Sequence, residues 1–308
     1  MSDQPSDIII VIPALNEEAT IAATIDGIRT TLSPNNCEVL VVDGGSNDRT
    51  VEIAHQKGAR VLHQDGTGYG DALRMGFQFA ILNHQEAGLI GMMDADGTYD
   101  PRDLPVLLEP IVQDRADLVV GNRTARMEHG AMSVTNRIGN RILSLAIRKL
   151  LHIQVYDTQS GLRLFRSDLV RCIDLRTTGM PFATEMLIEA KEANARIREV
   201  PISYRRRAGK TKLRPLTDGI RILVTVMRLT RDYNPILFFG GLGAVLLIAG
   251  VLIGLEVVAE WIVSGQITRL ASVVLSSLLI LTAIQLFSLG LLADMTRDVK
   301  TRVLKKIR

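Results

Sequence analysis

Two carboxylates stand two residues apart in the segment 92–101, which reads MMDADGTYDP. An apolar run leads into Asp94 and Asp96, so we expect the pair at the end of a buried β-strand with both side chains on one side of it. Such a pair can hold a hard divalent cation, Mg²⁺ or Mn²⁺, and leave coordination positions for substrate phosphates. An Asp-x-Asp pair also occurs in solvated turns, but its position after a buried strand favours a metal site.

Arginines follow this pair along the chain. Arg123 is expected at the end of a later strand, and Arg137 lies within a predicted helix over residues 136–151. That helix carries a cationic stripe opposite an apolar one. The two stripes are Arg137, Arg141, Ser144 and Arg148, and Ile138, Ile142, Leu145 and Ala146. A basic amphipathic helix is typical of membrane surfaces, although a surface helix with solvated arginines has the same pattern.

Six further cations crowd into residues 205–214, RRRAGKTKLR. Gly209 within this run and Pro215 after it predict a loop rather than a helix. The loop is either a solvated run of charge or a lid that closes on phosphates. Nucleic acid is a poor partner for it, because no aromatic residues are interleaved with the cations.

These side chains follow the strands of a repeating pattern. Short β-rich runs at residues 8–14, 38–45, 59–64, 89–96 and 116–123 alternate with helical patterns such as 17–31 and 71–83. The alternation predicts an α/β domain with a mainly parallel sheet covered on both faces. Ligands of such sheets bind beyond the carboxyl ends of the strands, where Glu17, Asp43, Asp94 and Arg123 are expected.

The C-terminal part of the chain differs in composition. The whole sequence has 308 residues, with 36 Lys and Arg against 33 Asp and Glu, which excludes a wholly membrane-embedded or disordered chain. Residues 236–258 and 270–293 are nevertheless almost uninterrupted apolar runs, and about 20 such residues cross a bilayer as a helix. A buried helical hairpin of a soluble protein is the alternative.

Charge around the two runs predicts how they are oriented. Arginines and lysines precede the first run and follow the second, and no secretory signal stands at the N-terminus. The excess of positive charge on both flanks predicts a cell-membrane protein with two spans, with the N-terminal domain and both termini in the cytoplasm.

Six motifs in a fixed order resemble a known family. They are PALNEE (13–18), VVDGGSNDRT (41–50), DADGTYDP (94–101), GNR (121–123), DTQSGLRLF (157–165) and EVPISYRRRAGKTKL (199–213). In this order they resemble the family 2 glycosyltransferases that transfer a sugar from a nucleotide-sugar to a polyprenyl phosphate, such as dolichyl-phosphate mannosyl- and glucosyltransferases. The resemblance covers about residues 7–230. It implies a GT-A fold, a GDP- or UDP-hexose donor, a divalent cation and an inverting single displacement.

The resemblance also implies roles for individual residues. It places Arg123 and Arg137 at the phosphate of the lipid acceptor, and Asp94 and Asp96 at the metal; these four are the expected catalytic residues. The expected donor-binding residues are Pro13, Ala14, Glu17, Asp43, Asp94, Ala95, Asp96, Arg207 and Lys212. The implied organisation is a GT-A domain over residues 1–215, an interfacial helix over 216–234, two transmembrane helices over 235–296 and a basic tail over 297–308.

Three positions depart from the family's usual pattern. Gly44 replaces a second acidic residue after Asp43, Tyr69 replaces a lysine between two glycines, and Thr98 replaces a glutamine found in many mannosyltransferases. These departures leave the base and the sugar of the donor open.

The acceptor chemistry needs little from the protein. A phosphomonoester has a second pKa of about 6, so it is largely ionised at neutral pH and needs no general base. Cations that hold it in line with the anomeric carbon are sufficient.

Two other interpretations of the function remain. One is a polysaccharide synthase with the same catalytic domain, although the Gln-x-x-Arg-Trp motif of such enzymes is not found around the only tryptophan, Trp261. The other is a non-catalytic membrane scaffold.

Four other polar residues have two interpretations each. Asp157 and Ser160 match a family motif near the acceptor, but an Asx-type turn explains them equally well. Glu185 is either an acceptor-facing or a structural carboxylate. Glu256 stands inside the first apolar run, near its outer end: a carboxylate within a membrane span is a candidate functional residue, but reaching out to water is the simpler explanation.

Overall fold

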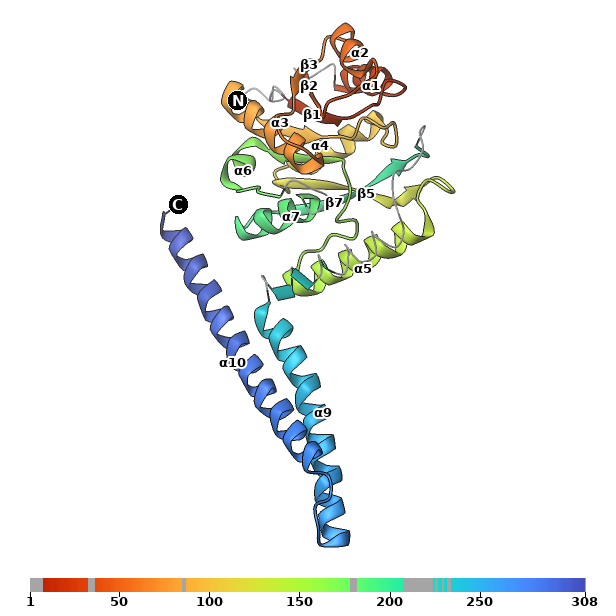
Figure 1. The fold of residues 1–308 in the computed structure, drawn as a ribbon. Coiled ribbons are helices and arrows are strands. Elements are labelled where there is room, and N and C mark those ends of the chain that lie inside the picture. Colours follow the sequence, from red (N-terminus) through yellow and green to blue (C-terminus); the bar gives the residue numbers. More distant parts are fainter. Residues whose placement is uncertain are drawn as a thin grey trace. The chain divides into compact units, whose positions relative to one another are not determined.

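The chain divides into two compact units, residues 1–219 and 220–308. The computed structural model describes residues 8–32, 37–84, 87–177, 182–207, 224, 227–228, 230–231 and 234–307. The first unit is an α/β domain and the second contains a pair of long helices (Figure 1). The expected interfacial helix over residues 216–234 lies almost wholly outside the described residues.

A seven-stranded sheet forms the centre of the first unit, in the order β3-β2-β1-β4-β6-β5-β7. The strands are β1 (Ile8–Ala14), β2 (Cys37–Asp43), β3 (Arg60–His63), β4 (Leu89–Met92), β5 (Leu118–Met127), β6 (Arg163–Arg166) and β7 (Ile197–Tyr204). All neighbours pair in parallel except β6, which runs antiparallel to both β4 and β5. The mainly parallel sheet predicted from the sequence is therefore confirmed.

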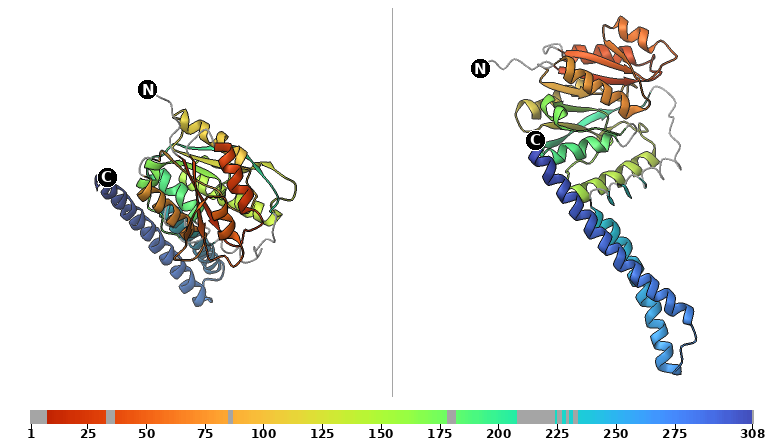
Figure 2. Two further views of the ribbon diagram at one scale, coloured as in Figure 1. Left: turned by 90° about the horizontal axis from the view of Figure 1, so that it is seen from above. Right: turned by 60° about the vertical axis from the view of Figure 1, so that its left-hand side comes forward.

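Helices cover both faces of this sheet (Figure 2). They are α1 (Ile21–Leu32), α2 (Thr50–Gln56), α3 (Tyr69–Asn83), α4 (Leu104–Val112), α5 (Val134–Leu151), α6 (Ser167–Cys172) and α7 (Phe182–Glu192), with a short 3₁₀ turn, η1, at Pro101–Asp103. In β1, Ile10 and Ile12 belong to a core shared with α1 and α4, whereas Val11 packs closely on Gly76 of α3. Because both faces of β1 are buried, its sequence is continuously apolar rather than alternating.

Two strand boundaries differ from the sequence prediction. β4 ends at Met92, so Asp94 and Asp96 lie in the loop after the strand and not on its last residues. The expectation that Arg123 ends the fifth strand is wrong, because β5 continues to Met127. The extension pairs with the end of β7 beyond an irregularity between Asn122 and Arg126, so a partner distant in sequence prolongs the strand.

The buried side of helix α5 carries both apolar and polar residues: Leu143 and Ile147 are buried beside Asn140 and Ser144. Its N-cap Ser133 accepts a hydrogen bond from the backbone N–H of Asn136 at 3.2 Å. The prediction that Ser144 shares an exposed cationic stripe is wrong, because Ser144 is only 1% exposed. Large apolar side chains are instead exposed: Val134, Ile138, Ile142 and Leu145. The inward face is partly polar because it contacts a polar loop, described below.

The second unit contains α9 (Pro235–Ser264) and α10 (Leu270–Ile307), packed antiparallel through small residues. Ser276 donates a hydrogen bond to the carbonyl of Gly250 at 2.8 Å, and Gly243 lies against the backbone of Ala283. Both helices are long and apolar enough to cross a membrane. These features suggest that the protein associates with membranes.

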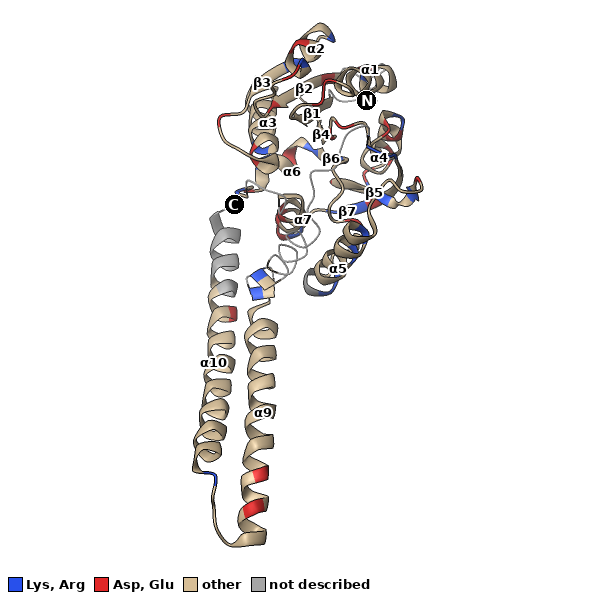
Figure 3. Cartoon of the chain, turned by 45° about the vertical axis from the view of Figure 1, so that its right-hand side comes forward, with Lys and Arg blue, Asp and Glu red and all other residues tan. Residues whose placement is uncertain are grey.

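Charge within the described part of this hairpin is concentrated at its link end (Figure 3). Glu256 forms an ion pair with Arg269 of the link at 2.5 Å. This pairing fits the simpler of the two interpretations of Glu256, that of a carboxylate at the end of an apolar segment. Residues 297–307, expected as a basic tail, continue helix α10.

Candidate active site

The loops after β1 and β2 are joined to each other at the carboxyl edge of the sheet. The backbone N–H of Asn16 donates to Ser46 Oγ at 2.9 Å, and Asn16 Oδ1 accepts from the N–H of Asn47 at 2.8 Å. The N–H of Glu17 donates to Thr50 Oγ1 at 2.8 Å. Glu17 therefore lies in a fixed turn that precedes α1, not in the helix where the sequence pattern placed it.

Asp43 shapes the turn that follows β2. Its carboxylate is buried and accepts hydrogen bonds from the backbone N–H groups of Gly45 and Ser46, each at 3.1 Å. The parallel register puts Asp43 beside Ala14, and Pro13 beside Val42. These three predicted donor residues thus meet at the ends of adjacent strands.

The loop after β4 holds the two acidic residues of the Asp-Ala-Asp motif, with Ala95 buried between them. Asp94 Oδ1 accepts a hydrogen bond from the hydroxyl of Tyr69 at 2.8 Å. Asp96 Oδ1 accepts from the backbone N–H of Thr98 at 3.1 Å and from its hydroxyl at 2.6 Å. Burial, together with the negative charge of Asp96, raises the pKa of Asp94 to about 6, against the opposing effects of Tyr69, Arg123 and Arg207.

Arg207 connects two of these loops. Its guanidinium pairs with Glu17 and lies 3.6 Å from Asp96 Oδ2. The segment that carries it is anchored two residues earlier, because the N–H of Arg205 donates to the carbonyl of Thr98 at 2.8 Å. The structure thus brings together Glu17, Asp96 and Arg207, while Lys212 lies outside the described residues.

The residues present fit a divalent cation that shares its coordination with a substrate. Among the described residues, no group of three or more His, Cys, Asp or Glu side chains could hold a metal by itself. Mg²⁺ in enzymes is commonly bound by one or two carboxylates together with substrate phosphates. Asp94 and Asp96 would supply those carboxylates, and their mutual repulsion is the kind that a cation relieves.

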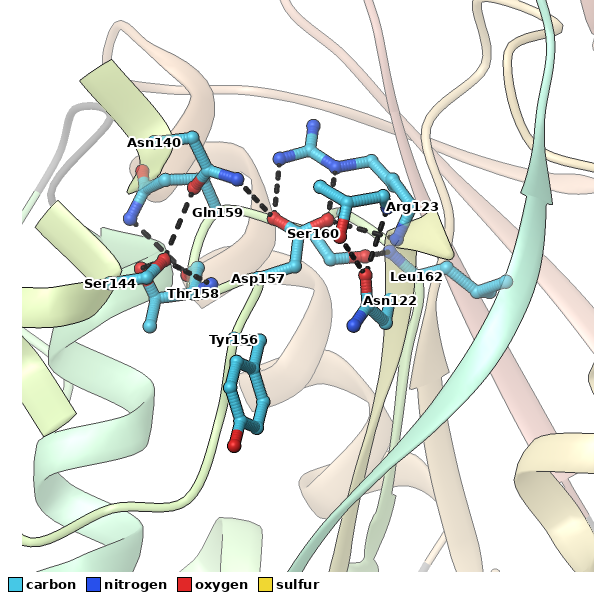
Figure 4. Close-up of polar contacts among 12 residues, drawn as sticks. Asn122, Arg123, Asn140, Ser144, Tyr156, Asp157, Thr158, Gln159, Ser160 and Leu162 are labelled. Atoms are coloured by element: carbon cyan, nitrogen blue, oxygen red, sulfur yellow. Dashed lines mark hydrogen bonds and ion pairs between the residues drawn. The ribbon is translucent and has the colours of Figure 1, made fainter. Parts of the chain in front are cut away.

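Arg123 forms a buried ion pair on the other side of the site (Figure 4). Its Nε and Nη2 atoms each donate to Asp157 at 2.8 Å, and its backbone N–H donates to the same carboxylate at 3.0 Å. Asn140 of α5 adds a further hydrogen bond to Asp157 at 2.9 Å. Although burial acts in the opposite direction, Arg123 and these hydrogen bonds lower the pKa of Asp157.

The loop that contains Asp157 is fixed from several elements. Glu199 of β7 accepts the backbone N–H groups of Tyr156 and Asp157 at 2.8 and 2.7 Å. Ser144 of α5 accepts the N–H of Thr158 at 3.2 Å. Arg163, fully buried, donates to three backbone carbonyls, those of Thr158, Ser160 and Ala183. Asp157 thus has a structural role, but not that of the expected Asx-type turn, because its carboxylate binds Arg123 and Asn140 of other elements.

This loop also contacts the loop that carries Asp94 and Asp96. A Cβ atom at Gly161 would lie 2.3 Å from Asp94 Oδ2, so only glycine fits against that carboxylate. The N–H of Gly161 donates to the hydroxyl of Tyr99 at 2.5 Å. The sequence motif DTQSG therefore joins the acidic loop to α5.

Arg137 differs from Arg123 in its surroundings. It is exposed on α5, and among the described residues its guanidinium has one hydrogen-bond partner, the sulfur of Met127 at 3.6 Å. Arg123 is 9% exposed and lies over the ring of Tyr204, with 5.3 Å between its Cζ atom and the ring centroid. No hydrogen bond joins the two arginines within the described part of the chain.

Glu185, which the sequence left open between an acceptor-facing and a structural carboxylate, accepts the backbone N–H groups of Arg176 and Thr177. Sequence reasoning missed two residues: Tyr69 was noted only as a departure from a lysine, and no role was considered for Glu199. Their partners lie far along the chain, and a single sequence gives no signal of such contacts. Tyr69 is the exception, because Gly68 and Gly70 on either side of it indicate that the backbone passes close to other atoms there.

Comparison with known proteins places this geometry in a family. Residues 9–174 match the family described as Glycosyl transferase family 2. The chain is 34% identical over 305 residues to the glycosyltransferase AglJ of Haloferax volcanii, covering 98% of both chains. It is also 34% identical to the dolichyl-phosphate hexose transferase of the same organism, covering 72% of this chain and 93% of that protein.

A solved structure shares the fold. The glucosyl-3-phosphoglycerate synthase of Mycobacterium tuberculosis, in complex with phosphoglyceric acid, is 25% identical with a TM-score of 0.58, and the match covers 73% of this chain and 80% of that one. The same synthase has been solved with Mn²⁺, UDP and its product. The expected GT-A fold is confirmed, and the chain is a glycosyltransferase that belongs to glycosyl transferase family 2.

Proposed function

We propose that this enzyme transfers a hexose from a nucleotide-sugar to a polyprenyl phosphate at a membrane surface, with inversion at the anomeric carbon. The observation that carries the proposal is the arrangement of Asp94, Asp96 and Arg207 at the edge of the sheet, within a chain that also has two bilayer-length helices. Relatives that are 30% or more identical are named for transfer to dolichyl and undecaprenyl phosphates.

The donor side would bind the nucleotide-sugar through its diphosphate. Mg²⁺ or Mn²⁺, held by Asp94 and Asp96, would neutralise the negative charge that develops on the departing nucleoside diphosphate. Arg207 already lies between Glu17 and Asp96, so its guanidinium is in position to meet a phosphate there. Pro13, Ala14 and Asp43 would line the nucleoside pocket, with Ala95 and Lys212 as further donor contacts.

The acceptor side would hold a phosphate that is already ionised. Arg137 is the accessible cation, on a helix whose exposed apolar stripe includes Ile138 and Ile142. Such a helix lies in the interfacial plane of a membrane, which is also the depth of the phosphate of a polyprenyl lipid. Arg123 is more enclosed, and we propose that it contacts the same phosphate while paired with Asp157.

An ionised phosphate oxygen is itself the nucleophile in this proposal. It attacks the anomeric carbon, the bond to the nucleoside diphosphate breaks, and no protein base is needed. A single displacement of this kind inverts the configuration. We further propose that α9 and α10 span the cell membrane, with the catalytic unit and both termini in the cytoplasm, since positive charge flanks the pair.

The test is an assay with the full chain in liposomes that contain one polyprenyl phosphate. A panel of radiolabelled GDP- and UDP-hexoses is added, and label that becomes extractable into organic solvent is measured. The proposal predicts a mild-acid-labile lipid product with one donor of the panel. Label in a water-soluble polymer would indicate a polysaccharide synthase, and no transfer with any donor would contradict the proposal.

A further inference from the structure

The carboxylate of Asp94 is held on both of its sides. Tyr69, the first residue of α3, donates its hydroxyl to Oδ1 at 2.8 Å. On the other side, the backbone of Gly161 lies so close that a Cβ atom there would be 2.3 Å from Oδ2. Neither contact belongs to the proposed donor or acceptor residues, and together they fix how the carboxylate is turned.

The backbone before Tyr69 aims it at this target. Gly68 is the N-cap of α3 and has φ of 98° and ψ of 161°, a conformation that other residues adopt only with strain. Gly70, which follows Tyr69, faces the carbonyl of Thr177 at a distance that leaves no room for a side chain. The chain therefore enters α3 along one path, which points the phenol towards the acidic loop.

Tyr69 is a neutral donor in this position. The phenol of a tyrosine keeps its proton at neutral pH, and here its hydroxyl donates that proton in a hydrogen bond to the Asp94 carboxylate. A neutral donor orients a carboxylate without cancelling its charge. Asp94 thus remains available as an anionic ligand, in contrast to Asp157, whose charge is neutralised by Arg123.

We propose that Tyr69 is a positioning residue that sets the affinity of the site for its divalent cation by holding Asp94 in one orientation. The inference rests on the proposed function only in taking Asp94 as a ligand of that cation. Partners that orient a ligating carboxylate are worth about 10- to 100-fold in metal affinity. Tyr69 is predicted to contribute within this range.

The experiment measures Mn²⁺ binding to the full chain at neutral pH. Mn²⁺ alone is titrated into the purified protein, and the free ion is followed by electron paramagnetic resonance. Tyr69→Phe keeps the ring and removes only the hydroxyl, and it is expected to raise the Kd for Mn²⁺ about 10- to 100-fold. Tyr156→Phe is the matched control, because Tyr156 is 55% exposed and lies outside the contacts of Asp94; its Kd should equal that of the wild type.

A merely structural role for Tyr69 gives a different result. Loss of packing or stability would lower the melting temperature of Tyr69→Phe and leave the Kd for Mn²⁺ unchanged, which would overturn the inference. Tyr69→Leu offers a second measurement: it also lacks the hydroxyl, so Mn²⁺ binding should weaken at least as much as in Tyr69→Phe. Wild-type affinity in Tyr69→Leu would also overturn it.

The inference and the proposed function fail separately. If the wild type makes the lipid-linked sugar but Asp94→Asn binds Mn²⁺ as tightly as the wild type, the role of Tyr69 is refuted and the transfer reaction stands. If no donor yields a lipid product while Tyr69→Phe still weakens Mn²⁺ binding, the positioning role stands and the assigned acceptor is wrong.

Discussion

Asp94 and Asp157 are two enclosed carboxylates in one catalytic unit whose proton affinities have shifted in opposite directions. Burial and the neighbouring Asp96 raise the pKa of Asp94 to about 6. The pKa of Asp157 is lowered, because Arg123 contacts both of its oxygens and Asn140 adds a third side-chain hydrogen bond. The charge of Asp94, on the proposed donor side, is thus only partly compensated, whereas that of Asp157, on the proposed acceptor side, is neutralised by Arg123.

The difference distinguishes a carboxylate that a bound cation would stabilise from one that is already stabilised by the protein itself. A buried carboxylate beside another carboxylate is unfavourable in isolation and becomes favourable when a cation binds. A bidentate ion pair such as that between Arg123 and Asp157 is already satisfied, and breaking it leaves an uncompensated charge. Substitutions on the donor side should therefore cost activity, and substitutions of Asp157 should cost stability.

The largest expected effect on activity is that of Asp96→Asn. If Asp96 is a ligand of the cation, its loss removes several kcal/mol of charge stabilisation, and transfer to lipid should fall about a thousandfold or more. EDTA should stop transfer by the wild type, and Mg²⁺ or Mn²⁺ should restore it. Circular dichroism should show that the variant is folded. Full activity of Asp96→Asn in the presence of chelator would contradict the metal role.

Asp157→Ala should affect stability first. It leaves the buried guanidinium of Arg123 without its carboxylate, and breaking a buried pair in this way costs about 3–5 kcal/mol. We expect a clear fall in the melting temperature measured by differential scanning fluorimetry in detergent. Asp114→Ala is the control, since Asp114 belongs to a solvent-exposed ion-pair network, where such pairs contribute about 1 kcal/mol or less. Equal melting temperatures for the two variants would show that the Arg123 pair is not structural.

Arg137→Ala should affect the acceptor and spare the donor. A charge-assisted hydrogen bond to the lipid phosphate is worth about 1.5–3 kcal/mol, so kcat/KM for the acceptor should fall about ten- to a hundredfold. Arg137→Lys should recover part of the loss, because an ammonium cannot make the planar two-pronged contact. If calorimetry shows instead that Arg137→Ala weakens nucleotide-sugar binding and leaves the KM for the lipid unchanged, the acceptor phosphate must lie elsewhere, first at Arg207.

The fold and the contacts of Asp94 show how much of this structure could be predicted from the sequence. The apolar runs of β1 and β2 predicted a mainly parallel sheet, because the period and the position of strands depend on local sequence, and the resemblance carried by the ordered motifs implied the GT-A fold. They also placed Asp94 correctly at the carboxyl edge of the sheet. The sequence could not show that Tyr69 and Gly161 hold Asp94, since these contacts span 25 and 67 residues.

Helix α5 shows a second limit. Its pattern predicted an amphipathic helix, and that is what forms over Val134–Leu151. Which face is buried could not be read from the pattern, because the usual rule puts apolar residues inside. Here Asn140 and Ser144 face inward to bind the Asp157 loop, and Ile138 and Ile142 face outward. Leu143 and Ile147 are buried beside them, so the rule holds in part, and a polar loop folded from distant residues explains why the inward face also carries polar side chains.

The smallest expected effect is a gain in stability from Asp94→Asn, and its dependence on pH sharpens the comparison between the two carboxylates. The folded-state pKa of Asp94, about 6, is above the ordinary value of 3.8, so between these values the native protein binds more protons than the unfolded chain. Stability therefore falls as pH rises from about 4 to 6 and stays lowered above that range.

An amide in place of the Asp94 carboxylate does not ionise and can still accept the hydrogen bond from Tyr69. At neutral pH in EDTA, the free energy of unfolding of Asp94→Asn should therefore be about 1–3 kcal/mol higher than that of the wild type, and this gain should shrink as the pH approaches 4. Asp65→Asn, which changes an exposed carboxylate outside the site, should show no such gain. A constant difference between Asp94→Asn and the wild type across this pH range would mean that the Asp94 carboxylate is not strained, and the contrast with Asp157 would then not hold.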